Sequence, residues 1–123
     1  MGEDAPGART LAEGLARLVG EQLSSVEFVQ DHVQLRFDGP CVTAFTWPVV
    51  RSASESLSWG QPGYRDALCS QISHLVERTE VDAQQVAIIF ESGVVFSISL
   101  REDDYQGPEA LNFTLNNRHW WVA

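Results

Sequence analysis

The sequence predicts an α+β domain made of two similar units, each a helix followed by a three-strand antiparallel meander. Residues 26–37, VEFVQDHVQLRF, match residues 79–90, TEVDAQQVAIIF, at a constant offset of about 53 residues. In both units, apolar residues with a helical period precede apolar residues with a period of two. We expect the strands to form one antiparallel sheet or a partly closed barrel, with the two helices packed against it.

One domain, residues 1–123, is expected because a chain of this length supports a single hydrophobic core. The repeat units cover roughly residues 10–50 and 63–101, and residues 102–123 should pack on them. The connection at residues 51–63 is rich in Ser, Gly and Pro, which is typical of a loop.

Each predicted helix has its own boundary signals. Thr10 and Glu13 in TLAE form a capping-box pattern, and Gly20 is a stop signal. The second helix follows the breakers of WGQPG and runs from about residue 64 to residue 73. The apolar faces comprise Leu11, Leu15, Leu18 and Val19 in the first helix and Tyr64, Leu68 and Ile72 in the second.

Alternating residues predict the strands. Val33, Leu35 and Phe37 alternate with polar residues, Asp38-Gly39 is a tight-turn signal, and a return strand is expected at residues 41–47. The second unit repeats this pattern with Val86, Ile88 and Phe90 before the turn and Val94, Phe96, Ile98 and Leu100 after it.

The charge balance excludes several classes of function. The chain has 17 acidic and 8 basic residues, a net charge of -9, and every basic residue is an arginine. Without lysine, neither Schiff-base chemistry nor a phosphate-binding P-loop is available. The negative field disfavours nucleic acids and anionic membranes, and it favours encounter with a basic partner.

Cofactor and metal signatures are missing from the sequence. Cys41 and Cys69 lack CxxC spacing, and His32, His74 and His119 lack HxxxH or HxH spacing. The first residues, MGEDAPGART, show no signal-peptide pattern. We expect a cytoplasmic protein with reduced thiols, no cofactor, no metal and no membrane span.

The segment REDDYQGPEALNF contains the most concentrated charge. Glu102, Asp103 and Asp104 follow a predicted strand, where consecutive side chains point to alternate sides and do not converge on one ion. They are expected to form a solvated strand end. Pro108 restricts the backbone just before Glu109, so this carboxylate is expected to cap a helical turn or to pair with an arginine such as Arg101 or Arg118, with a binding role as the alternative.

Four tryptophans are the other candidates for a site. Trp47, on the return strand, is expected in the core. Trp59, next to Gly60 in the connection, is expected to be exposed, as is one of Trp120 and Trp121, which point to opposite faces of a strand. An exposed tryptophan is a frequent anchor in protein interfaces.

The segments LRFDGP, GYRDALC, ISL and GPEA resemble, in order and spacing, a group of small bacterial proteins with the same doubled pattern. The resemblance spans roughly residues 18–113 and implies no activity, cofactor or partner. It implies that the turn at Glu109 belongs to the shared pattern, together with Gly39, Pro40, Tyr64, Arg65, Asp66, Gly107 and Pro108.

These observations favour a non-enzymatic module that binds a basic protein, in the manner of an inhibitor or immunity protein. Its expected contact surface consists of Glu102, Asp103, Asp104, Glu109, Trp59 and one of the C-terminal tryptophans, Trp120 or Trp121.

Two other functions remain open at this point. One is a small-molecule pocket between the two meanders, lined by Trp47, Tyr64 and Trp120. The other, weaker one is an enzyme that pairs Asp66 with Glu109. The chain is expected to be a monomer or a homodimer, since an exposed strand edge can pair with a second copy.

Overall fold

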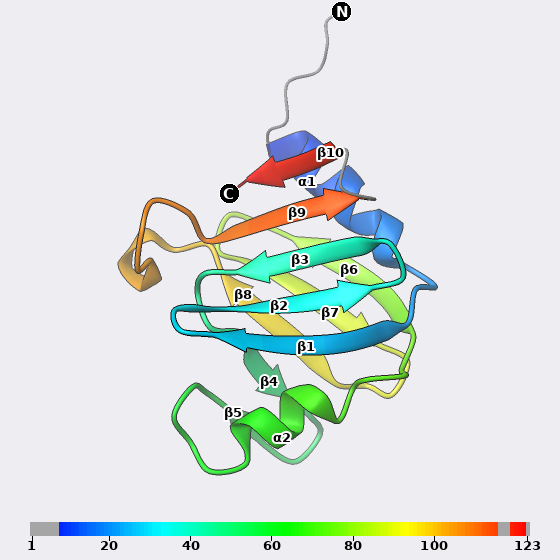
Figure 1. Ribbon diagram of the computed structural model, residues 1–123, viewed down its shortest axis with the longest axis vertical. Coiled ribbons are helices and arrows are strands. Elements are labelled where there is room, and N and C mark those ends of the chain that lie inside the picture. The colour runs from blue at the N-terminus through cyan, green and yellow to red at the C-terminus, as the bar shows by residue number, and fades with distance from the viewer. Residues whose placement is uncertain (1–7, 116–118, 123) are drawn as a thin grey trace, which may run out of the picture.

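The strands form two five-stranded antiparallel sheets, one in front of the other (Figure 1). The computed structural model describes residues 8–115 and 119–122, with side chains from residue 11 to residue 115. The front sheet has the order β1-β2-β3-β9-β10 and consists of β1 (Leu23–Val29), β2 (His32–Phe37), β3 (Pro40–Ala44), β9 (Leu111–Leu115) and β10 (His119–Val122). The rear sheet has the order β5-β4-β8-β7-β6 and consists of β5 (Ser56–Leu57), β4 (Val49–Arg51), β8 (Val95–Ser99), β7 (Gln85–Phe90) and β6 (Val76–Val81).

The expectation of one continuous sheet or a partly closed barrel is therefore wrong, whereas the mixed α+β class with antiparallel strands is confirmed. After each meander the chain crosses to the other sheet. β4 follows β3 but pairs with β8, and β9 follows β8 but pairs with β3. The crossing after β3 contains Pro48, which has no backbone N–H to continue a strand ladder. The apolar pattern identifies strands, but it does not say which sheet each strand joins.

Strand pairing is similar in the two halves of the chain. β1 carries a register shift between Leu23 and Ser25 against β2, and β6 carries one between Val76 and Arg78 against β7. The starts of β1 and β6 also meet, through an isolated antiparallel bridge from Gln22 to Leu75. A duplicated origin of the two halves stays a prediction.

Two helices lie at opposite ends of the pair of sheets (Figure 1). α1 (Ala8–Leu15) contacts β6 of the rear sheet and β9 and β10 of the front sheet, and η1 (Ala16–Leu18) continues it. α2 (Tyr64–Cys69) contacts β1 and β4. Each helix thus bridges both sheets and closes one end of the space between them.

Helix boundaries differ from the predicted ones. α1 covers Ala8–Leu15, so Thr10 lies inside the helix and the predicted capping box is wrong. The stop at Gly20 is confirmed by its left-handed φ of 87°. α2 ends at Cys69 instead of near residue 73, because the chain then enters turns and Ser73 adopts a φ of 82°.

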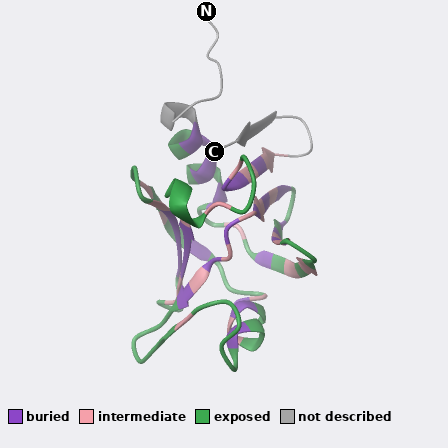
Figure 2. Cartoon of the chain, turned by 90° about the vertical axis from the view of Figure 1, so that its left-hand side faces the viewer, coloured by how far each residue is buried: buried purple, intermediate pink, exposed green. Residues whose placement is uncertain are grey.

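The core fills the space between the sheets. Its largest fully buried side chains come from both helices and from both sheets, and Figure 2 shows the connecting loops mainly as exposed. At about 25 cal/mol per Å² of buried apolar surface, this core is the main source of stability. The largest of these side chains are Tyr64, Phe90, Phe96, Phe113, Leu15, Leu18, Leu23, Leu35, Leu68, Ile88, Ile98 and Leu111.

Candidate functional site

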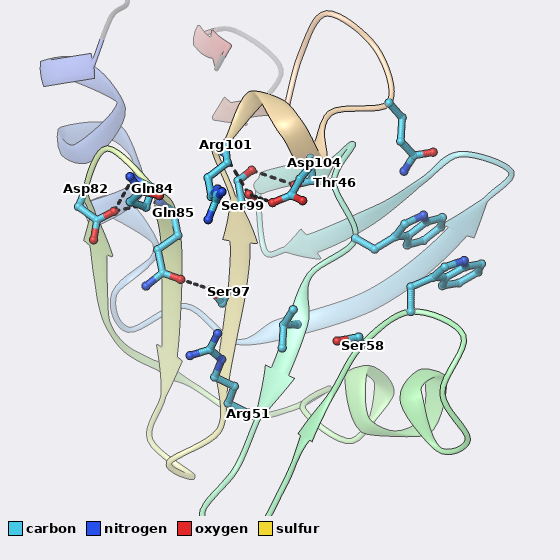
Figure 3. Close-up of a pocket in the computed structure, with 14 residues that line it drawn as sticks. Thr46, Arg51, Ser58, Asp82, Gln84, Gln85, Ser97, Ser99, Arg101 and Asp104 are labelled. Atoms are coloured by element: carbon cyan, nitrogen blue, oxygen red, sulfur yellow. Dashed lines mark hydrogen bonds between the residues drawn. The ribbon is translucent and has the colours of Figure 1, made fainter.

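A groove of about 740 Å³ lies on the outer face of the rear sheet (Figure 3). Val50 pairs with Phe96, and both side chains are buried in the core. Because successive side chains of a strand point to opposite faces, the neighbouring positions face outward. These outward positions form the floor of the groove, which consists of Val49 and Arg51 from β4, Ser97 and Ser99 from β8, and Gln85 from β7.

Two stacked tryptophans form one wall of the groove. The ring centroids of Trp47 and Trp59 are 3.9 Å apart, and the ring planes differ by 8°. Trp59 also meets the edge of Tyr64 at 5.9 Å between centroids. Trp59 is 42% exposed although its ring packs against both of these neighbours. An anchor fixed in this way loses little side-chain entropy on binding.

Arg65 in α2 extends the stack. Its guanidinium carbon lies 4.9 Å from the centroid of Trp59 and 5.6 Å from that of Phe28 in β1. The rings of Trp47 and Trp59 are in direct contact, with no room for a guanidinium between them. Arg65 therefore lies outside the stacked pair. The cation–π contacts therefore connect the groove wall to the front sheet.

Two carboxylates lie at one end of the groove. Oδ1 of Asp82 accepts hydrogen bonds from the backbone N–H groups of Gln84 (2.7 Å) and Gln85 (2.9 Å). Oδ2 of Asp104 accepts one from the Ser99 hydroxyl at 2.6 Å. The pairing of Gln85 with Ser99 brings the two segments together. Each carboxylate is thus oriented through one oxygen, while its second oxygen has no hydrogen-bond partner among the described residues.

Arg51 marks the other end. Figure 3 shows it at the far side of the floor from Asp82, Arg101 and Asp104. Arg51 is exposed, and within the described part of the chain its guanidinium forms neither an ion pair nor a hydrogen bond. The groove therefore has an anionic end and a cationic end.

The predicted acidic residues are only partly brought together. Glu102, Asp103 and Asp104 form the exposed 3-10 turn η2 (Glu102–Asp104), but only Asp104 lines the groove. Glu109 is half-buried in a neighbouring depression of about 180 Å³ that also contains Asp31 and Phe45. Gln106 lines both depressions.

The predicted pairing of Glu109 is not seen among the described residues. Its carboxylate forms no ion pair or hydrogen bond with them, and Arg101 instead lies 3.7 Å from the carboxylate of Asp103. Arg118, the other arginine expected to pair with Glu109, lies outside the described residues.

The aromatic predictions have mixed outcomes. Trp59 is exposed as predicted, whereas Trp47 is half-buried at the groove and does not belong to the fully buried core. Trp120 and Trp121 lie in β10, opposite Thr114 and Phe113, but their side chains lie outside the described ones.

Of the residues expected to line a pocket between the meanders, the two whose side chains are described do not form one there. Tyr64 is only 2% exposed and donates a hydrogen bond of 2.5 Å to the carbonyl of Pro48, and Trp47 lines the outer groove. The Asp66–Glu109 pair is also unsupported, since Asp66 lies on α2 and Glu109 on the loop before β9, and the two line separate depressions (Figure 1).

Sequence reasoning missed Arg51, Asp82, Gln85 and Ser97. Ser97 and Ser99 alternate with buried residues in VFSIS, so the period of two could have identified them as outward-facing. Arg51 was assigned to the loop at residues 51–63, although β4 includes it and pairs with β5.

No group of three histidine, cysteine or carboxylate side chains in the described part of the chain could hold a metal ion. Within the same residues, no helix is long and apolar enough to cross a membrane.

The comparisons with known proteins returned nothing: no protein-family model matches the chain, and neither a curated protein nor a solved structure matches it.

Proposed function

We propose that the protein is a non-enzymatic binding module that holds another protein in the groove on the rear sheet. One observation carries the proposal: Trp59, 42% exposed, and the oriented carboxylate of Asp104 line the same groove. Interface hot spots are commonly aromatic side chains of this kind, surrounded by polar groups. Both residues also belong to the contact surface expected from the sequence.

Charge supports a basic partner. The net charge of -9 accelerates encounter with a positively charged surface, and Asp82 and Asp104 offer free oxygens to an arginine or lysine side chain. An inhibitor or immunity protein that covers a basic partner in the cytoplasm is one form of this function. The contribution of Glu102 and Asp103 would then be long-range attraction, since both lie beside the groove.

Affinity capture with matched variants tests the proposal. Wild type, Trp59→Ala, Asp104→Asn and Val29→Ala are immobilised in parallel, and native lysate is applied at low and high salt. Val29 is the control because it is 43% exposed on the front sheet, away from the groove. We expect wild type and Val29→Ala to capture one protein in stoichiometric amount at low salt. Its capture should be weaker on Trp59→Ala and Asp104→Asn, and it should be lost at high salt. Equal capture by all four proteins would contradict the proposal.

A second candidate, a small-molecule site in the same groove, is supported by unused polar groups. The Ser58 hydroxyl, the Gln84 side-chain amide and the Gln85 Nε2 have no hydrogen-bond partner among the described residues, and all three residues line the groove. The volume also lies within the usual range for ligand sites. A metabolite that raises the melting temperature in proportion to the logarithm of its concentration, for wild type but not for Trp59→Ala, would favour this function.

Duplication of one ancestral unit is proposed as the origin of the two halves. The support is the register shift that recurs at Leu23/Ser25 and at Val76/Arg78, 53 residues apart. The groove combines β4 of the first half with β7 and β8 of the second, so neither unit would build it alone.

A further inference from the structure

We propose that the groove selects an extended segment of its partner that carries a basic side chain at one end and a carboxylate at the other, and that Arg51 binds this carboxylate. The inference rests on the proposed function. It changes the expected partner from a uniformly basic protein to one whose contact segment has both charges.

The charges of the groove are separated along the strand direction. Asp82 and Asp104 line the end near Ser99, and Glu102 and Asp103 follow beside it. Arg101 is the one described cation at this end, and it lies 3.7 Å from Asp103 in an exposed pair of the kind that contributes little. This end therefore has a net negative charge.

The opposite end has the reverse sign. Arg51 pairs through its backbone with Val95 in β8 and with Ser56 in β5, so its position on the floor is fixed by strands on both sides. No carboxylate among the described residues forms an ion pair with it. A uniformly basic segment that filled the groove would place a positive group against this guanidinium, which is unfavourable.

The strand geometry sets the spacing of the partner's charges. Along β8, Val95 lies beside Arg51, and Ser99 hydrogen-bonds Asp104. Positions 95 and 99 are four residues apart along the strand, which is about 13 Å at the usual rise of a strand. An extended partner segment has the same rise, and its residues i and i+4 point to the same side. The basic and acidic side chains should therefore be four residues apart.

The centre of the floor offers a hydrogen-bond donor to a partner's backbone. Ser97 in β8 has a small side chain and lines the groove at this point. The Oε1 of Gln85 accepts a hydrogen bond from the Ser97 hydroxyl, so the amide is oriented and its Nε2 is available to donate. A peptide carbonyl between the two charged side chains is a suitable acceptor.

Selection from a random heptapeptide library displayed on phage tests the inference. Wild type, Arg51→Glu and Trp59→Ala are panned in parallel after circular dichroism confirms that each is folded. We expect wild type to enrich peptides with a basic and an acidic residue four positions apart, and Arg51→Glu to enrich peptides with a basic residue at both positions. A synthetic copy of a peptide selected on wild type should bind Arg51→Glu about fivefold more weakly than it binds wild type, which is the equivalent of one exposed ion pair.

The outcomes separate the inference from the function on which it rests. Peptides that are only basic and are shared by wild type and Arg51→Glu, but lost on Trp59→Ala, would overturn the role of Arg51 and leave the proposed function standing. Enrichment of the same peptides on all three proteins, or no enrichment on wild type, would overturn both.

Discussion

Trp47 and Trp59 stack with their ring centroids 3.9 Å apart, although β4 and β5 lie between them in the sequence. The stack fastens the loop before α2 to the segment in which the chain crosses from the front sheet to the rear sheet. The same contact that shapes the groove wall therefore also holds the connection between the two halves.

Replacing Trp59 with Ala should lower the free energy of unfolding by about 1 kcal/mol, because an aromatic pair contributes roughly this amount beyond its buried area. Chemical denaturation followed by far-UV circular dichroism measures the change. Val29→Ala, at an equally exposed position without a ring contact, should stay within about 0.5 kcal/mol of wild type. An unchanged stability of Trp59→Ala would show that the stack does not hold the loop.

The buried hydroxyl of Tyr64 should make stability fall at alkaline pH. Burial raises the pKa of Tyr64 above its usual value of about 10, so the unfolded chain loses this proton at lower pH than the folded chain does. The stability contributed by the buried, protonated Tyr64 is therefore fully present below pH 10 and is lost progressively as the pH rises above this value. Urea denaturation at a series of pH values from about 8 to 11 measures this slope.

Tyr64→Phe is the matched variant for that slope. It should be less stable than wild type at neutral pH by about 1–3 kcal/mol, because the carbonyl of Pro48 loses its hydrogen bond in a buried position. Its stability should also decline less between pH 8 and pH 11 than that of wild type. Parallel slopes for the two proteins would mean that other groups cause the alkaline loss.

The two free cysteines should react with a thiol reagent in two separate phases. Cys69 is exposed, whereas Cys41 is half-buried on β3, and burial raises the pKa of the Cys41 thiol. The thiolate is the reactive form, so Cys41 should react more slowly. Absorbance after mixing with Ellman's reagent follows both phases, and Cys69→Ser should remove only the fast one. Loss of the slow phase in that variant would reverse the assignment.

Two glycine substitutions should differ in their effect on stability. Gly63 precedes α2 with a φ of 85°, which a side chain disfavours, so Gly63→Ala should cost about 1–2 kcal/mol. The added Cβ would lie 3.9 Å from Leu57, an ordinary contact, so the cost comes from the backbone.

Gly107 provides the comparison, because its φ is not positive and a methyl group added there would meet no atom within 4 Å beyond its chain neighbours. Gly107→Ala should therefore be neutral or slightly stabilising. Thermal unfolding of both variants measures the difference, and equal melting temperatures would contradict it.

Local patterns predicted much of the secondary structure. The alternation of Val33, Leu35 and Phe37 with polar residues corresponds to β2, and the turn at Asp38-Gly39 lies between β2 and β3 as expected. These signals are contained in a few consecutive residues. Their interpretation therefore did not depend on the rest of the fold.

The pairing of distant strands could not be predicted in the same way. Nothing in the apolar pattern of β4 or β9 distinguishes pairing with the nearest meander from pairing with the other one. The groove depends on this choice, since Arg51 reaches the same surface as Ser97 only because β4 joins β8. Sequence reasoning consequently included Trp59 and Asp104 in one expected surface but missed Arg51 and Ser97, which line the groove with them.

The exchange of strands between the halves has a consequence for synthesis on the ribosome. β3 pairs with β2 as soon as both have emerged, but its other edge waits for β9, whose residues are made about 70 positions later. In the rear sheet, β4 is made before its partner β8 and likewise lacks this neighbour until β8 has emerged. The nascent chain would therefore carry an open strand edge until β9 has been made, and the two sheets should form in one late, cooperative step.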